Sequence, residues 1–133
     1  MKNSLSWVGL AMGSLLSSGC IVAVDHHDSG YDSVLTVEWT INDSQSSNRC
    51  TQSSASSAEI TVSSSRGYDE HRTVDCRDFA AEFYVPPGRY RVTVQLLDYD
   101  GEPRTTAATA DSHEIYEDVD DNVVIDFGAE SFF

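Results

Sequence analysis

The sequence has few basic side chains and a single lysine, Lys2. It contains eight Lys and Arg residues against 22 Asp and Glu residues, which gives a formal net charge of −14 at pH 7. Proteins that bind nucleic acid without sequence preference need Lys and Arg to neutralise phosphates, and attraction to anionic lipids has the same requirement. The composition therefore excludes both functions. At a length of 133 residues, one domain is expected.

Motifs of common metal and catalytic sites are also missing. No Cys-x-x-Cys occurs, and no histidine lies within a few positions of Cys50, so a structural metal site is not expected there. No Gly-x-Ser-x-Gly occurs, and the densest run of serines offers no histidine base for a nucleophilic triad. No pair of carboxylates stands out as a hydrolytic pair. The sequence therefore predicts no catalytic residues and a protein that is not an enzyme.

Residues 1–20 have the features of a secretory signal. Lys2 forms a short basic region, residues 5–16 are mainly apolar, and three small residues precede Cys20. The apolar stretch is short and interrupted by Ser and Gly, which makes it a poor membrane span.

The segment LLSSGC that ends at Cys20 resembles the lipobox of bacterial lipoproteins, with Ser17 where that family usually has Leu. The resemblance implies that residues 1–19 are removed as a signal peptide and that Cys20 carries a diacylglycerol. The protein would then be anchored in the cell envelope. Ile21, in place of Asp, implies the outer membrane, on its periplasmic or surface side.

Residues 20–33 are rich in Asp, His, Ser and Gly, and we expect them to form a flexible tether between lipid and fold. Within this tether Asp25–Asp28, DHHD, could bind zinc or copper, but adjacent histidines on a flexible chain rarely converge on one ion. Two alternatives to the lipid anchor remain open. One is ordinary cleavage after Gly19 or Ala23, and the other is an uncleaved anchor.

The other two cysteines are expected to pair with each other. If Cys20 carries lipid, Cys50 and Cys76 remain, and an exported chain permits a disulfide between them. Closing a loop of this length would stabilise the fold by roughly 3 to 4 kcal/mol in the chain-entropy model. Two unpaired buried thiols are the alternative.

The rest of the chain, residues 34–133, alternates between apolar and polar side chains as half-buried strands do. The expected strands are residues 34–41, 58–64, 71–76, 79–85, 89–97, 104–116 and 123–127, with a polar loop at 42–57 and no helix. Turn signals separate them, including a type II turn with Gly88 at its third position and a hairpin turn at residues 98–101. The pattern predicts an all-β fold, an antiparallel β-sandwich of about seven strands.

Residues 85–101, VPPGRYRVTVQLLDYDG, resemble the PPG-x-Y-x-V-x-V-x-L-x-D-x-x-G segment of prealbumin-like and carboxypeptidase-regulatory-like sandwiches. The layout as a whole is also similar to small myxobacterial-type lipoproteins of unknown function. The resemblance implies an Ig-like or prealbumin-like sandwich. It brings no catalytic residues, because its motifs are core strands and turns.

Two acidic clusters are candidates for a ligand. Asp98, Asp100 and Glu102 lie on one turn, and four acids lie within residues 117–121 on another. Calcium needs six to eight oxygen ligands, and Asp-x-Asp-Gly-Glu is a fragment of such a loop. The number of strands between the clusters places them at opposite ends, so we expect solvated turns and no metal. A weak Ca²⁺ site at the first cluster is the alternative.

Other side chains are expected to be structural. Trp39 belongs to the core, and His71 and His113 are read as surface or edge residues. Tyr68 and Tyr99 lie on turns at opposite ends, so they cannot share an aromatic platform for sugars.

The sequence thus indicates a lipid-anchored envelope protein with a structural, adhesive or accessory role and no catalysis. Its expected partners are the membrane, reached through the lipid, and another envelope protein, but no nucleic acid. The alternative is a calcium- or carbohydrate-binding surface module.

Overall fold

The computed structural model describes residues 33–133, except for the side chains of Asp111 and Ser112. The expected signal peptide, Cys20, the histidine pair at residues 26–27 and the tether up to residue 32 lie outside the described residues.

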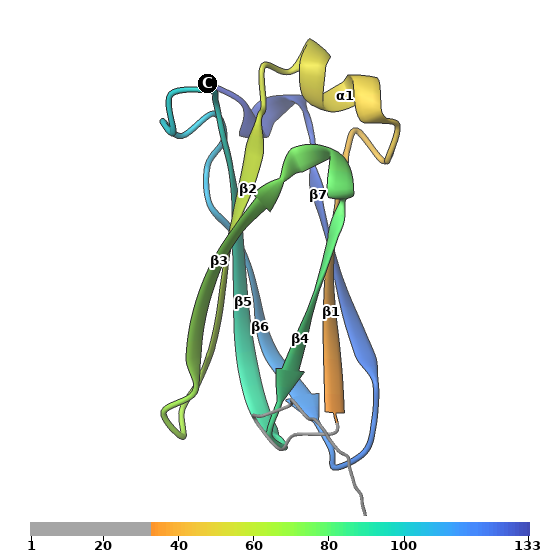
Figure 1. Ribbon diagram of the computed structural model, residues 1–133, viewed down its shortest axis with the longest axis vertical. Coiled ribbons are helices and arrows are strands. Elements are labelled where there is room, and N and C mark those ends of the chain that lie inside the picture. Colours follow the sequence, from red (N-terminus) through yellow and green to blue (C-terminus); the bar gives the residue numbers. More distant parts are fainter. Residues whose placement is uncertain (1–32) are drawn as a thin grey trace, which may run out of the picture. The chain divides into compact units, whose positions relative to one another are not determined.

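Seven strands form two sheets that face each other (Figure 1). The strands are β1 (Ser33–Ile41), β2 (Ser57–Ser64), β3 (Asp69–Asp75), β4 (Ala80–Val85), β5 (Gly88–Leu97), β6 (Ala108–Ile115) and β7 (Asp121–Phe127). One sheet has the order β4-β1-β7, and the other has the order β3-β2-β5-β6. This arrangement confirms the all-β sandwich, the number of strands and their approximate positions.

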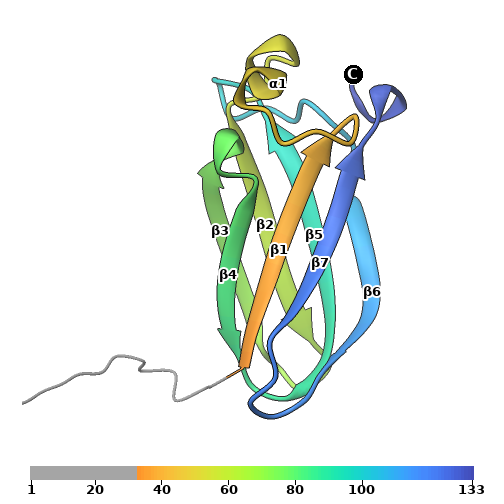
Figure 2. The same cartoon turned by 90° about the vertical axis from the view of Figure 1, so that its right-hand side faces the viewer.

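One pair of strands departs from the antiparallel expectation. The first and last strands, β1 and β7, run parallel from Leu35↔Asp121 to Ile41↔Phe127 (Figure 2). All other strand pairs are antiparallel. Parallel neighbours need a long connection, and here the whole chain between β1 and β7 provides it. The alternation of apolar and polar residues shows which face of a strand is buried, but it does not show which strand lies beside it. The sequence therefore could not predict the pairing of β1 with β7.

The core lies between the sheets and follows the predicted alternation. In β1 the inward positions Leu35, Val37, Trp39 and Ile41 are fully buried. The inward side chains of β2, β4, β5 and β7 are buried in the same way. Trp39 also donates a hydrogen bond from Nε1 to the carbonyl oxygen of Cys76, at 3.0 Å. Trp39 thus fills the core with its ring and also provides a hydrogen bond to a buried carbonyl.

The described residues also form three short helices, none of which was expected. They are the α-helix α1 (Ser47–Gln52) and the 3₁₀ helices η1 (Cys76–Asp78) and η2 (Ala129–Ser131). The prediction of a loop throughout residues 42–57 is therefore wrong over α1. This helix is polar, has no side-chain cap and buries only Cys50. Its sequence lacks the apolar residues at helical spacing from which a helix is usually predicted.

A disulfide joins Cys50 on α1 to Cys76 on η1, with 6.1 Å between the two Cα atoms. Both cysteines are buried. The predicted pairing is confirmed, and the alternative of two unpaired thiols is wrong. The two cysteines lie at the same end of the sandwich, as the number of strands between them required.

The turns follow the sequence signals in part. Gly101 has φ +80°, and its N–H donates to the Asp98 carbonyl at 3.0 Å, so the hairpin turn is confirmed. Gly88, in contrast, is the first residue of β5 and has no positive φ, so the type II turn is wrong. At the other end of β4, Phe79 has a positive φ of 55°.

Candidate functional site

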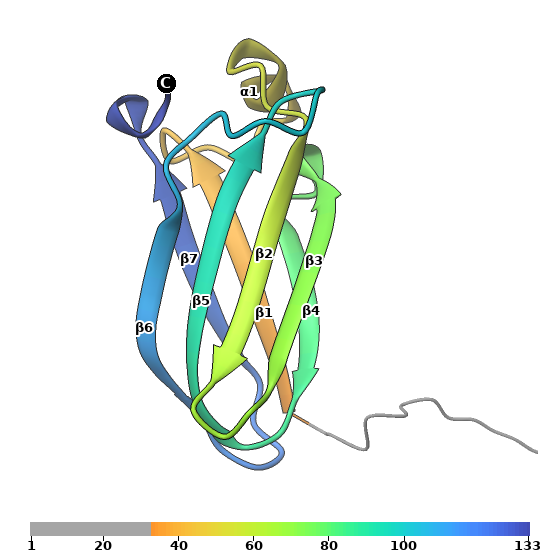
Figure 3. The same ribbon diagram turned by 90° about the vertical axis from the view of Figure 1, so that its left-hand side faces the viewer.

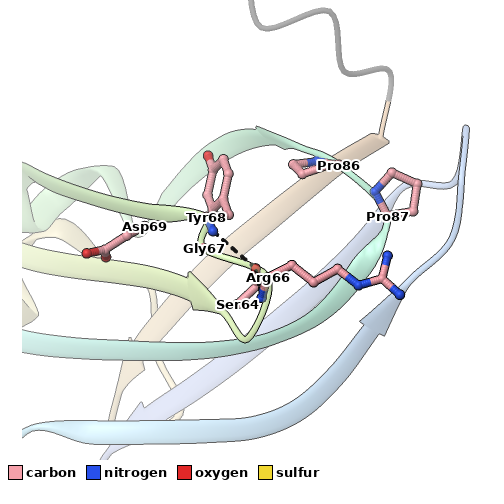
Figure 4. A pocket seen from close by; sticks show the side chains of 7 residues that line it. All are labelled: Ser64, Arg66, Gly67, Tyr68, Asp69, Pro86 and Pro87. Carbon is pink, nitrogen blue, oxygen red and sulfur yellow. Dashed lines mark hydrogen bonds between the residues drawn. The ribbon is translucent and has the colours of Figure 1, made fainter.

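A cleft of about 680 Å³ lies at the end of the sandwich where β1 begins (Figure 4). One wall is the turn between β2 and β3, and the other is the turn between β4 and β5. The residues that line it are Ser64, Arg66, Gly67, Tyr68, Asp69, Pro86 and Pro87. We refer to it as the 66/86 cleft. Its volume falls within the range of about 300–1,000 Å³ that is usual for ligand pockets.

The turn between β2 and β3 is held in one conformation by its own hydrogen bonds. The Ser64 hydroxyl oxygen accepts the N–H groups of Arg66 at 3.2 Å and Tyr68 at 3.3 Å. Gly67 has φ +99°, a conformation that glycine adopts without the strain a side chain would bring. This wall of the cleft is therefore shaped before any ligand arrives.

The two walls are connected by a pair of tyrosines. The hydroxyl group of Tyr90, from β5, donates to the carbonyl oxygen of Pro86 at 2.5 Å. The Tyr68 ring meets the Tyr90 ring edge-on, with 5.7 Å between centroids and 82° between planes. The Tyr68 hydroxyl oxygen also lies 3.3 Å from the Tyr84 carbonyl oxygen. These contacts fix the spacing of the two walls.

Behind the cleft, a network closes the gap between the edges of β3 and β4. Arg72 donates to Glu70 Oε2 at 2.6 Å and to the Glu82 carbonyl at 2.7 Å, and its guanidinium group lies 4.1 Å from the Phe83 ring centroid. Glu70 Oε1 accepts the Tyr68 hydroxyl at 2.6 Å. Charged side chains thus occupy the inward positions of β3, which explains why its apolar alternation is weak.

The same network changes the acidity of its members. Burial raises the pKa of Tyr68, and the hydrogen bond to the Glu70 carboxylate raises it further. For Glu70, burial alone would raise the pKa, but hydrogen bonds from Tyr68 and Arg72 outweigh it and lower the pKa below its usual value. At neutral pH the phenol is therefore protonated and the carboxylate ionised, as the hydrogen bonds require.

Arg66 brings a positive charge to the rim of the cleft. Among the residues that the structure describes, only the guanidinium groups of Arg66 and Arg49 lack a hydrogen-bond or ion-pair partner. Arg49 lies on α1, at the other end of the sandwich (Figure 2). Sequence reasoning did not single out Arg66, because the cleft forms only when two turns distant in sequence meet.

Of the three candidate calcium residues, Asp98 uses its carboxylate to hold its own turn. Asp98 Oδ1 accepts the N–H groups of Asp100 at 2.8 Å and Glu102 at 3.0 Å. The second acidic cluster, at residues 117–121, lies in the turn between β6 and β7 at the opposite end. Within the described part of the chain, no group of three or more His, Cys, Asp or Glu is placed to hold a metal ion. The structure therefore does not bring the two clusters together.

The structure reveals one arrangement of hydroxyl, imidazole and carboxylate that the sequence did not suggest. Thr61 Oγ1 lies 3.0 Å from His71 Nδ1, and His71 Nε2 lies 3.7 Å from Asp69 Oδ1. Thr61 lies on β2 opposite His71 on β3, and His71 and Asp69 are exposed. Strands β2 and β3 lie side by side in the four-stranded sheet (Figure 3). Thr61 is paired on both sides, with β3 and β5, so the ladder already uses the backbone N–H groups around it. The strand pairing leaves these backbone groups unavailable for an oxyanion hole, and the order of groups alone does not support catalysis.

The other histidine in the described region lies between the two sheets. His113 Nε2 on β6 is 2.9 Å from Asp121 Oδ2 on β7. This contact joins the edges of the two sheets on the side opposite to Arg72. The interpretation of His113 as an edge residue is confirmed.

At the disulfide end, an acidic side chain caps the helix that carries Cys76. Asp75 Oδ1 accepts the N–H of Arg77 at 2.8 Å, and the Arg77 guanidinium bonds to both carboxylate oxygens. These bonds lower the pKa of Asp75 to about 2. A cavity of about 80 Å³ lies beside Cys50, and Tyr99 borders it. Tyr99 and Tyr68 thus lie at opposite ends, as predicted.

The comparisons with known proteins identify no family for this chain. No protein-family model matches the sequence, and no curated protein shows significant similarity to it. Between residues 33 and 133, every helix is too short or too polar to cross a bilayer.

Proposed function

We propose that this protein is a lipid-anchored protein of the cell envelope, with a structural, adhesive or accessory role and no catalysis. The observation that carries the proposal is the pairing of Cys50 with Cys76. Of three cysteines, this leaves Cys20 as the one that can take a lipid, and it stands at the end of a lipobox-like segment. A disulfide also suits an oxidising compartment outside the cytoplasm.

The charge of the chain is compatible with this role. A net charge of −14 keeps a tethered domain soluble and repels it from the anionic surface beside it. The membrane would then be reached through the lipid, while the domain itself faces another envelope component. The outer membrane remains the proposed location, because Ile21 follows the cysteine.

The anchor predicts a specific mass for the protein taken from its native membrane fraction without reduction. We expect the mass of Cys20–Phe133 plus acyl chains, two hydrogens below the value for free thiols. Intact-mass spectrometry measures both features at once. Cys20→Ser should move the protein out of the membrane fraction. A lipid-free mass for the unmutated chain would contradict the anchor and would favour a secreted, diffusible protein.

The 66/86 cleft favours a second candidate function, that of a saccharide-binding module. It combines an aromatic ring and two proline rings with a charged rim on a rigid frame. Calcium binding has less support, because Asp98 already accepts two backbone N–H groups.

Calcium binding can be separated from turn stability by two variants. Asp98→Ala should lower the free energy of unfolding by about 1 kcal/mol, with calcium or with a chelator, because two hydrogen bonds are lost. Asp100→Ala keeps those bonds and is the proper test of a metal ligand. Thermal unfolding of the unmutated protein should show the same midpoint with calcium and with chelator. A calcium-dependent rise that Asp100→Ala abolishes would restore the calcium alternative.

A further inference from the structure

The guanidinium group of Arg66, at the 66/86 cleft, makes no contact that stabilises the described part of the fold. Arg66 is exposed at the tip of the turn between β2 and β3, and its guanidinium group has no partner among the described residues. In a chain with 22 acidic residues, a carboxylate to pair with it would be easy to supply. Hydrogen bonds to the Ser64 hydroxyl hold the backbone of this turn, so the Cα of Arg66 has a defined position at the rim.

Figure 4 shows how the side chains around the cleft are directed. Arg66 extends from its turn toward Pro87, across the opening between the walls. Asp69 points the other way, so its carboxylate does not neutralise the guanidinium. The positive charge therefore faces the cleft, where an incoming anion would meet it.

Part of the remaining surface of the cleft is apolar. The Tyr68 ring and the rings of Pro86 and Pro87 supply it. Their positions are fixed by the hydrogen bond from Tyr90 to Pro86 and by the edge-on contact of Tyr68 with Tyr90. A rigid surface of this kind loses little conformational entropy when it binds a rigid ring. The C–H face of a pyranose ring is such a partner, with its hydroxyl groups left at the rim.

We infer that the 66/86 cleft binds an acidic saccharide, in which a carboxylate on the pyranose ring pairs with the guanidinium group of Arg66. A guanidinium group offers two parallel N–H donors that match a carboxylate, and such charge-assisted pairs are stronger than neutral hydrogen bonds. The inference rests on the second candidate function, the saccharide-binding module. It does not depend on the lipid anchor.

The test is a calorimetric titration of the full-length protein with three probes of similar size. They are a trimer of galacturonate, the same trimer with its carboxylates methyl-esterified, and a trimer of glutamate. We expect the galacturonate trimer to bind and the ester to bind more weakly. Arg66→Gln should weaken binding of the galacturonate trimer by about 10- to 100-fold. Arg66→Lys, which keeps the charge but not the planar pair of donors, should lose less.

Arg49→Gln is the matched control. It removes the same charge from α1, at the other end of the sandwich, where the Arg49 guanidinium also has no partner among residues 33–133. It should leave binding unchanged. Equal losses with Arg49→Gln and Arg66→Gln would mean a general charge effect and would overturn the inference.

The remaining outcomes separate the inference from the function on which it rests. Equal binding of the ester and the acid would leave a saccharide-binding module but remove the role of the carboxylate. If the glutamate trimer binds as tightly as the galacturonate trimer, the ligand class is wrong. Absence of binding by both saccharides at about 10 mM would overturn the inference and the second candidate function together.

Discussion

Replacing Cys50 and Cys76 together by Ala is expected to lower the free energy of unfolding by about 3 to 4 kcal/mol. The disulfide closes a loop across a sequence separation of 26 residues, so its loss gives the unfolded chain many more conformations. It is also the main link that holds α1 in place, because Cys50 is the one residue that this helix buries. Urea unfolding followed by circular dichroism measures the difference.

The control for this variant is Thr51→Ala, on the exposed side of the same helix. Its effect should stay within about 0.5 kcal/mol. The unmutated protein, once reduced, should unfold like the double variant. If the double variant is as stable as the oxidised protein, packing rather than the covalent bond holds α1 against η1.

Trp39→Ala is expected to destabilise the protein by about 3 to 5 kcal/mol. Trp39 is fully buried between the sheets and packs near Phe79, with 6.5 Å between ring centroids. Its removal leaves a large cavity and also takes one of two hydrogen-bond donors away from the Cys76 carbonyl. Denaturant unfolding of the variant, compared at equal temperature and pH, gives the free-energy difference.

Trp39→Phe divides this loss into its two parts. Phe restores most of the volume but removes one of two donors to the Cys76 carbonyl, which still accepts the Phe79 N–H at 3.2 Å. The loss of this one hydrogen bond should cost about 0.5 to 1.5 kcal/mol. Val124→Ala is the matched surface control, because Val124 lies on β7 next to β1 but is exposed. It should change stability by about 0.5 kcal/mol or less. If Trp39→Phe proves as stable as the unmutated protein, the hydrogen bond to Cys76 contributes nothing.

The period-two alternation was sufficient to predict most strands and the direction of their side chains. It worked for β1 and β5 because each buries one complete face and leaves the other polar. It was weak for β3, where Glu70 and Arg72 stand at inward positions and are satisfied by Tyr68 and by the edge of β4. The partners of Glu70 and Arg72 lie in other segments of the chain, so the sequence of β3 alone does not predict this network.

Features that depend on distant partners could not be predicted. Helix α1 has polar residues all round, and the structure stabilises it through Cys50 rather than through its own sequence. The cysteines were found because three residues with one chemistry allow few pairings. The 66/86 cleft was not found, because Arg66 and Pro87 carry ordinary turn signals in two separate segments. Only their meeting in space makes them a site.

The parallel pairing of β1 with β7 determines how the domain would respond to tension. Both strands run from the end where Ser33 lies to the end near Phe133 (Figure 2). A force that pulls these two residues apart draws β1 and β7 past each other along their length. All hydrogen bonds from Leu35↔Asp121 to Ile41↔Phe127 are then loaded in shear and must break together, rather than one by one as in unzipping. A domain held at Ser33 and gripped at its far end would therefore resist mechanical unfolding far better than its thermal stability suggests.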